Sequence, residues 1–424
     1  MKPNADNRLL RLVWGERLYR PERLNLVDGG RIEVVSPGDP DDVTGSFTGA
    51  QIVLEGAVCR GDVLVGECGG DRNPRLRAVA DRAVLQVVAA PSVPVCRAGG
   101  DPLPQAVMAV EESVLEVYGE LLSRAGSCRC GEEIARMDGF KRLSLMTRLQ
   151  VERLHRKSCE LMEIHAGGGE NWNETLYVML FRAMGDNRNK EAFTRLARTV
   201  PYTAVSRERG SLFSVEALLL GGSGLLETRS EDDYILHLRK EFEYLRRKYG
   251  IVPMRPIAWK LGGIQPYNAP VLRIVQMAAF LTAKEFVFDN LLACRTPQDV
   301  QRLFSAEASG YWTTHFTPSR RSAFTPKRIG TEKANLLGIN LVSVLQFAYA
   351  NSRDDDRLRE AAIALLEQTP CERNRIVAGW QACGVEIGNA FDSQAMLELT
   401  RLYCGQKRCA ECGLGKYLIK RRFA

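Results

Sequence analysis

The pattern of hydrophobic and polar positions changes near residue 100. Before that point, short β-branched runs alternate with glycine, proline and aspartate, which is typical of strands separated by turns. The clearest runs are residues 31–35, 50–54, 63–65 and 83–88. Their spacing predicts a meander that forms one sheet, and the Pro- and Gly-rich residues 92–104 predict the exit from it.

From residue 105 onward, apolar residues recur at helical spacing. The clearest stripe lies in residues 231–249, where an apolar side chain returns every three or four positions. Ser230 and Asp233 predict a capping box at the start of this helix. Similar stripes in residues 172–183 and 358–366 predict two further helices. Such stripes are typical of core-facing surfaces, so they predict no ligand site.

These patterns predict an α+β protein with a small N-terminal mixed sheet followed by a large, mainly α-helical region. We expect a sheet domain at 1–104, a helical body at 105–390, and a C-terminal helix, cysteine segment and basic tail at 391–424. Hydrophobic residues make up 45% of the chain and charged residues 26%, which excludes disordered, collagen-like and rod-like coiled-coil classes.

The chain offers no hydrophobic segment suited to export or to a membrane. Residues 1–11 are polar and charged and do not predict a signal peptide. The longest apolar stretch, residues 271–288, is interrupted by Arg273, Lys284 and Glu285, which predicts no membrane span. We therefore expect a cytoplasmic protein whose 12 cysteines are thiols or metal ligands rather than disulfides.

Positive charge is concentrated at the C-terminus. The net charge is +7, and residues 401–424 contain seven basic residues and one acidic residue, which leaves about +1 for the remainder. Such tails often contact phosphate groups, so we expect DNA or RNA as a partner. The candidate nucleic-acid-binding residues are Lys416, Lys420, Arg421 and Arg422. Tyr417 and Phe423 lie among these cations and suit base stacking, although ordinary packing explains them equally well. The alternative is a solvated C-terminus with no partner.

The strongest local motif is a C-x₄-C-x₂-C cluster near the C-terminus. Thiolates at this spacing can converge on one zinc ion or iron–sulfur cluster, which normally needs a fourth ligand. The candidate metal ligands are Cys404, Cys409, Cys412 and Cys383. Cys371 is the next nearest candidate, and the pair Cys128 and Cys130 is too closely spaced to predict a metal site by itself. The alternative is that these cysteines are reduced thiols packed as small hydrophobic side chains.

Common catalytic motifs are absent from the sequence. Residues 221–224 are followed by Leu225, so the G-x-S-x-G pattern of a nucleophile elbow is incomplete. No phosphate-binding loop or dinucleotide-binding glycine motif occurs, and the four histidines are scattered. Serine hydrolase, NTPase and dehydrogenase activities are therefore disfavoured.

Several segments along the chain resemble the bacterial domain-of-unknown-function 2851 family. They are Trp14 and residues 28–29, 170–177, 192–201, 216–226, 238–249, 259–260, 273–274, 311–312, 339–340, 347–349 and 392–415. The last block is the most specific, because it joins Asp392-Ser393-Gln394-Ala395 to Cys409-x-x-Cys412-Gly413-Leu414-Gly415.

The resemblance implies a restriction-endonuclease-like core in the N-terminal third. Such a core uses paired carboxylates on neighbouring strands to hold a divalent ion against the scissile phosphate. Here the expected carboxylate positions are Ser46 and Leu64, and the family's aromatic and histidine positions are Ala80 and Gln86. This implies a degenerate nuclease fold without a catalytic site. The alternative is that the sheet is only a scaffold.

We therefore expect a non-catalytic nucleic-acid-associated factor with a structural metal-binding cysteine cluster. One alternative is a metal-dependent nuclease that draws its carboxylates from Asp41, Asp42, Asp62 and Glu67. A second alternative is a protein-interaction module in which the helical body is the working surface.

Overall fold

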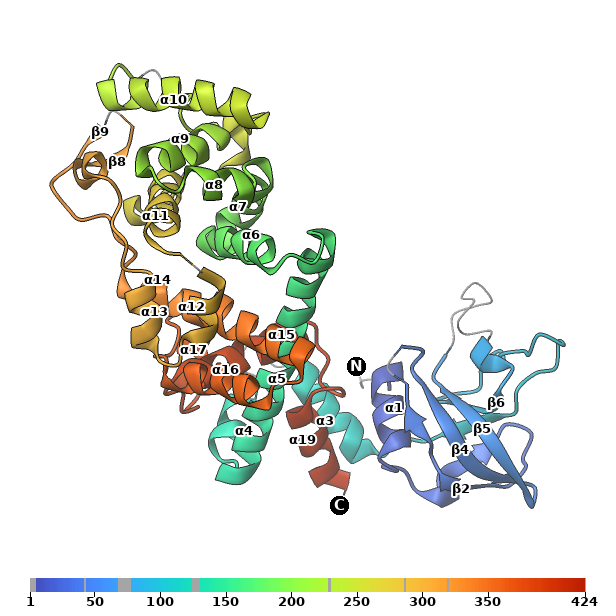
Figure 1. The fold of residues 1–424 in the computed structure, drawn as a ribbon. Coiled ribbons are helices and arrows are strands. Elements are labelled where there is room, and N and C mark those ends of the chain that lie inside the picture. Colours follow the sequence, from blue (N-terminus) through green and yellow to red (C-terminus); the bar gives the residue numbers. More distant parts are fainter. Residues whose placement is uncertain are drawn as a thin grey trace. The chain divides into compact units, whose positions relative to one another are not determined.

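The computed structural model describes residues 5–41, 43–67, 78–123, 130–227, 230–285, 287–318 and 320–423. Contacts divide the chain into two compact units, coloured along the sequence in Figure 1. The first unit contains Met1–Leu145, Arg375–Glu386 and Met396–Ala424, and the second contains Met146–Asn374 and Ile387–Ala395. The α+β class with a mixed sheet and many helices is confirmed.

The first unit is built on a mixed sheet. Its strands in the described residues are β1 (Leu24–Leu26), β2 (Ile32–Ser36), β3 (Asp39–Pro40), β4 (Ser46–Leu54), β5 (Ala57–Val65), β6 (Ala83–Val88) and β7 (Gln105–Met108). The strand order is β1-β7-β6-β5-β4-β2, and β3 pairs with β4. The last strand therefore begins just beyond the expected sheet boundary at residue 104.

The predicted meander is wrong after β5. Strands β2, β4 and β5 are antiparallel neighbours, as a meander requires, but β5, β6 and β7 are mutually parallel. Parallel neighbours need a crossover connection, because the chain must return to the same end of the sheet. In contrast, Glu55 and Gly56 both have positive φ, of 48° and 87°, and give the tight turn that joins β4 to β5.

Helix α1 (Asn7–Gly15) belongs to the first unit and buries Leu9, Val13 and Trp14 completely. The Asp6 carboxylate accepts from Leu9 N and caps its start. The other carboxylate oxygen of Asp6 accepts from Tyr118 Oη at 2.8 Å. That tyrosine lies on α3 (Glu112–Ser123), so one side chain joins two helices of this unit.

The remaining helices of the first unit come from both ends of the chain. In the described residues they include α4 (Gly131–Ala135), α17 (Arg375–Ala382), the π-helical turn η6 (Thr400–Cys404) and α19 (Gly413–Phe423). Helix α19 packs on α3. The C-terminal residues 413–423 are therefore an ordered helix rather than a frayed tail.

The second unit is almost entirely helical. Its helices include α6 (Trp172–Met184), α7 (Asp186–Thr199), α8 (Tyr202–Glu208), α9 (Leu212–Gly222), α10 (Asp233–Tyr249), α11 (Pro270–Ala283), α12 (Val287–Ala293), α13 (Pro297–Leu303), α14 (Thr331–Leu337), the π-helical turn η5 (Gly338–Val342), α15 (Ser343–Arg353) and α16 (Asp356–Gln368). Helices α5 (Gly139–Gly167) and α18 (Ala390–Leu399) contribute residues to both units. The helices predicted at 172–183, 231–249 and 358–366 are confirmed.

The prediction that Ser230 and Asp233 form the capping box of α10 is wrong, because a different residue is the N-cap. Asp232 is the N-cap, and its carboxylate accepts from Tyr234 N at 3.1 Å. Ser230 instead accepts from Asp232 N at 3.2 Å, which fixes the capping residue. Gly250 ends the helix in the left-handed conformation, with φ of 65°.

None of the helices in the described part of the chain is long and apolar enough to cross a bilayer.

Candidate nucleic-acid interface and cysteine segment

The cysteine segment, residues 404–412, turns tightly between η6 and α19. Arg408 N donates to Tyr403 O at 2.9 Å and closes the turn. Gly415 then lies so close to the segment that a Cβ there would be 2.0 Å from Cys409 O. Only glycine permits this contact, so Gly415 determines how α19 begins against the cysteine segment.

The three cysteines of this segment differ in how deeply they are buried. Cys409 and Cys412 are buried, and Cys404 is half-buried. Cys409 Sγ lies 3.9 Å from Leu121 O on α3. Burial, the hydrogen bond to Asp6 and the neighbouring Cys409 all raise the pKa of Tyr118 on the same helix. The cysteine segment is therefore seated against α3.

Cys383 lies directly after α17 and packs against α4. A Cβ added at Gly131 would lie 2.3 Å from Cys383 Cβ and 3.2 Å from its Sγ. The residue before that glycine is Cys130, which is buried and precedes the first residue of α4. Sequence spacing alone does not indicate that Cys383 lies beside the start of α4, because this proximity comes from packing between helices distant in the chain. Cys128 lies outside the described residues.

Within the described ranges, no group of three or more His, Cys, Asp or Glu side chains is arranged to hold a metal ion. The ligand set Cys404, Cys409, Cys412 and Cys383 therefore stays a prediction.

Helix α19 presents cations around an aromatic ring. We define its basic face as Lys416, Tyr417, Lys420 and Arg421, which helical spacing places on one side, together with Lys141 from the start of α5. The Lys141 Nζ lies 5.3 Å from the centroid of the Tyr417 ring. Leu414 and Ile419 of α19 are buried, and their packing holds the helix in place.

Acidic side chains neutralise part of this charge. Lys420 Nζ lies 2.5 Å from the Glu16 carboxylate. Arg421 and Arg422 line a cavity of about 420 Å³ with Glu120 and Glu133. Arg422 is exposed, but helical spacing turns it toward this cavity and away from Lys416. The structure thus places three of the four predicted residues on the basic face and Arg422 beside it.

The positions expected to carry nuclease carboxylates are neighbours in the sheet. Ser46 of β4 and Leu64 of β5 are register partners, and Leu64 is in turn paired with Gln86 of β6. Ser46 is 1% exposed and Leu64 2% exposed. Leu64 packs in an apolar cluster with Val79, Ala80, Ala83 and Leu103. This row therefore has no carboxylate at either expected position, and its face is filled by apolar packing.

The alternative acidic residues are held by local contacts. The Asp62 carboxylate accepts from Gly49 N and lies 3.4 Å from Arg82 Nε. Hydrogen bonds from the Thr44 hydroxyl and from Val43 N lower the pKa of Asp41, which stabilises a turn before β4. Glu67 is exposed, and Asp42 lies outside the described residues. The nuclease alternative built on these residues stays a prediction.

The fold defines an α+β protein with an N-terminal mixed sheet and a large helical unit. The chain belongs to the family described as protein of unknown function DUF2851, whose model matches residues 7–375. The match covers the sheet and most of the helical unit and ends before the cysteine segment and α19. No curated protein and no solved structure matches the chain.

Proposed function

We propose that this protein is a non-catalytic nucleic-acid-associated factor of the cytoplasm that contacts DNA or RNA through the basic face of α19. The observation that carries the proposal is the position of Tyr417 among Lys141, Lys416, Lys420 and Arg421. Cations of this kind contact phosphates without reading sequence, and the half-buried Tyr417 ring between them provides a surface for base stacking.

The nuclease-like row supports a binding role without cleavage. Metal-assisted phosphodiester cleavage needs carboxylates that hold the ion at the scissile phosphate. Ser46 and Leu64 occupy those two positions, and both are buried. The proposal therefore assigns nucleic-acid binding to α19 and no cleavage to the sheet.

We further propose that the cysteine segment holds zinc or an iron–sulfur cluster and fixes the start of α19. Thiolates are the preferred ligands of both groups, and Cys409 and Cys412 are already buried beside the first turn of α19. Elemental analysis of anaerobically purified protein should find about one equivalent of metal, which Cys409→Ser should remove. Metal-free protein from the same preparation would contradict this part of the proposal.

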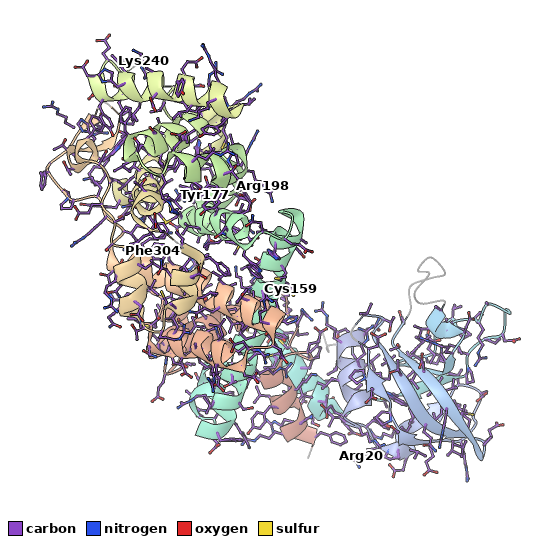
Figure 2. The ribbon with its side chains drawn as sticks, in the orientation of Figure 1. Arg20, Cys159, Tyr177, Arg198, Lys240 and Phe304 are labelled. Atoms are coloured by element: carbon purple, nitrogen blue, oxygen red, sulfur yellow. The ribbon has the colours of Figure 1, made fainter. Side chains whose placement is uncertain are left out.

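Fluorescence anisotropy with labelled single-stranded DNA and RNA tests the nucleic-acid role. The double variant Lys416→Gln/Arg421→Gln should weaken binding about tenfold at low salt and reduce the salt slope by about 1.4, since each lost phosphate contact contributes about 0.7. Lys240→Gln is the matched control, because Lys240 is an exposed lysine on α10 (Figure 2).

Two results would contradict the nucleic-acid proposal. One is equal affinity and equal salt slope for the wild-type protein and the α19 double variant. The other is no binding to either nucleic acid at low salt, which would favour a protein-interaction role for the helical unit.

A further inference from the structure

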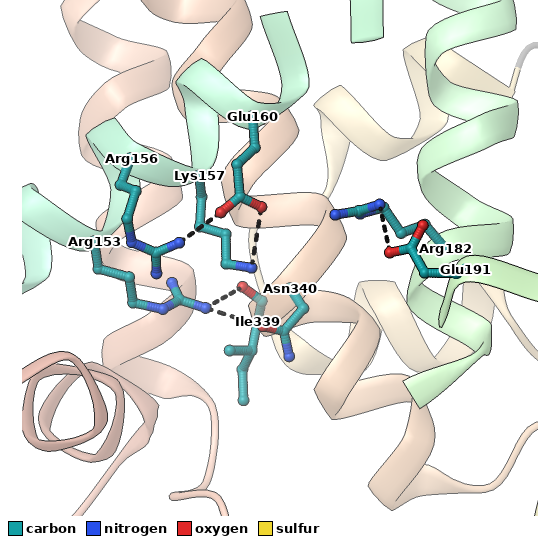
Figure 3. Close-up of polar contacts among 8 residues, drawn as sticks. All are labelled: Arg153, Arg156, Lys157, Glu160, Arg182, Glu191, Ile339 and Asn340. Carbon is teal, nitrogen blue, oxygen red and sulfur yellow. Dashed lines mark hydrogen bonds and ion pairs between the residues drawn. The ribbon is translucent and has the colours of Figure 1, made fainter. Parts of the chain in front are cut away.

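We infer that the helical unit contains a phosphate-binding site formed by cationic side chains of α5, α6 and α7. The site, here called the α5 cluster, consists of Arg153, Arg156, Lys157, Arg182 and Lys190 around Glu160. Figure 3 shows all of these side chains except Lys190. The inference goes beyond the proposed function, because it concerns the other unit and does not require α19.

Glu160 is the centre of the α5 cluster. Its carboxylate accepts from Arg156 Nη1 at 2.7 Å and lies 3.7 Å from Lys157 Nζ. Arg182 reaches toward the cluster from α6, and its own ion pair is with Glu191 at 3.4 Å (Figure 3). The Glu191 side chain is 81% exposed, so solvent strongly screens that pair.

Arg153 is fixed at the base of the cluster by the π-helical turn η5. It is 2% exposed, and its Nη2 donates to Ile339 O at 3.2 Å and to Asn340 Oδ1 at 3.1 Å. A π-helical turn changes the regular pattern of backbone hydrogen bonds, and such turns are frequent at functional sites. Here η5 supplies both acceptors that orient the buried guanidinium.

The charges of the cluster repel one another. Burial, followed by the charges of Lys190, Arg153 and Arg156, lowers the pKa of Lys157 to about 8, against the attraction of Glu160. Burial raises the pKa of Glu160, but the surrounding Lys157, Arg156, Lys190 and Arg182 bring it below its ordinary value. A bound dianion would offset this repulsion and favour the protonated Lys157.

The cluster is accessible and chemically suited to phosphate. The side chains of Lys157, Arg156 and Arg182 are 22%, 23% and 21% exposed, so solvent reaches them while their charges remain partly desolvated. Arginine forks match the oxygens of a phosphoryl group, and a lysine adds a compact positive charge. The shared ligand chemistry is thus a phosphoryl dianion, whether free or at the end of a nucleic acid.

Calorimetry and thermal unfolding with inorganic phosphate test this site in the full-length protein. Ionic strength is held constant with sodium chloride. Phosphate at about ten times its Kd should raise Tm by about 3 °C, and Lys157→Gln or Arg182→Gln should weaken binding about tenfold. The wild type should lose phosphate affinity as pH rises through about 8, the pKa of Lys157. Lys157→Arg should bind phosphate and should not show this loss of affinity.

Arg148→Gln is the matched control, since Arg148 lies on the same helix, is 51% exposed and pairs with Glu152 outside the cluster. It should bind phosphate as the wild type does. Equal phosphate affinity in the wild type and Lys157→Gln would overturn the inference. So would equal effects of phosphate and chloride on the wild-type Tm.

Competition distinguishes the two sources of the phosphoryl group. If the site takes the end of a nucleic acid, an oligonucleotide with a terminal phosphate should displace inorganic phosphate, and the same oligonucleotide with a terminal hydroxyl should not. If it takes a small phosphate compound, neither should. The α19 double variant should keep phosphate binding. Lys157→Gln should keep the salt slope that the wild type shows with the hydroxyl-ended oligonucleotide, so either proposal can fail alone.

Discussion

Glu216 is a buried carboxylate on α9 whose removal should strongly destabilise the helical unit. It is 0% exposed and accepts from Tyr234 Oη at 2.6 Å, from Trp312 Nε1 at 3.1 Å and from Ser309 Oγ at 3.2 Å. Leaving a buried donor without its acceptor costs about 1–3 kcal/mol. For three side-chain donors with partial relaxation, we expect Glu216→Ala to lower the free energy of unfolding by about 4 kcal/mol.

Glu216→Gln separates these hydrogen bonds from the buried charge. The amide oxygen can still accept from Tyr234 and Trp312, and the cost of burying a carboxylate disappears. We therefore expect this variant to stay within about 1 kcal/mol of the wild type in urea unfolding followed by circular dichroism. Glu360→Gln on α16 is an exposed control and should leave the midpoint unchanged. Equal losses in Glu216→Ala and Glu216→Gln would refute the hydrogen-bond argument.

The same residue predicts a pH dependence with a definite sign. Burial raises the pKa of Glu216, although hydrogen bonds from Tyr234, Trp312 and Ser309 act in the opposite direction. The folded-state pKa lies above the unfolded value. The contribution of Glu216 to the free energy of unfolding is therefore fully present below the unfolded pKa of about 4.5. It is lost as pH rises to the folded-state pKa. The wild type should therefore lose stability over this range relative to Glu216→Gln, and parallel pH profiles would contradict the assignment.

Three further substitutions test other parts of the structure. Lys327 is 2% exposed, and its Nζ lies 3.8 Å from the Phe316 ring centroid without a hydrogen-bond partner. Burial lowers the pKa of Lys327. Because a buried charge without a partner is costly, Lys327→Met should keep or raise Tm in thermal unfolding. Gly415→Ala should expose α19 to hydrogen exchange, because the new Cβ would meet Cys409 O, whereas Gly139→Ala has open space and should not. Leu64→Glu should cost more than about 3 kcal/mol in urea unfolding, because it places an unpaired charge in an apolar cluster, whereas Leu64→Met should cost less than about 1.5 kcal/mol.

Local patterns predicted the individual elements well because their signals are local. The strand at 83–88 and the helix at 172–183 follow from β-branched runs and apolar periodicity. The parallel pairing of β5 with β6 was not predictable in this way, since it depends on where residues distant in sequence meet. When all strands have the same β-branched composition, composition cannot show whether two successive strands are joined by a crossover or by a hairpin.

The candidate sites show the same division between local and long-range information. The basic residues of α19 are adjacent in sequence, so their clustering was predictable. The contact of Cys383 with Gly131 joins residues far apart in the sequence, so the spacing between cysteines could not indicate it. Arg153 and Glu216 were missed because a buried charge and a surface charge look identical in sequence.

The row of Ser46, Leu64 and Gln86 explains why both proposals place binding outside the sheet. Gln86 accepts from Val95 N at 3.0 Å and from Gln105 Nε2 at 3.2 Å, so the row beside Leu64 holds the chain that leads to β7. Apolar packing fills one part of this row and structural hydrogen bonds fill another. Ser46, Leu64 and Gln86 of this row contribute no carboxylate. The two proposals therefore assign phosphate contacts to other surfaces, namely α19 and the α5 cluster, where positive charge is concentrated.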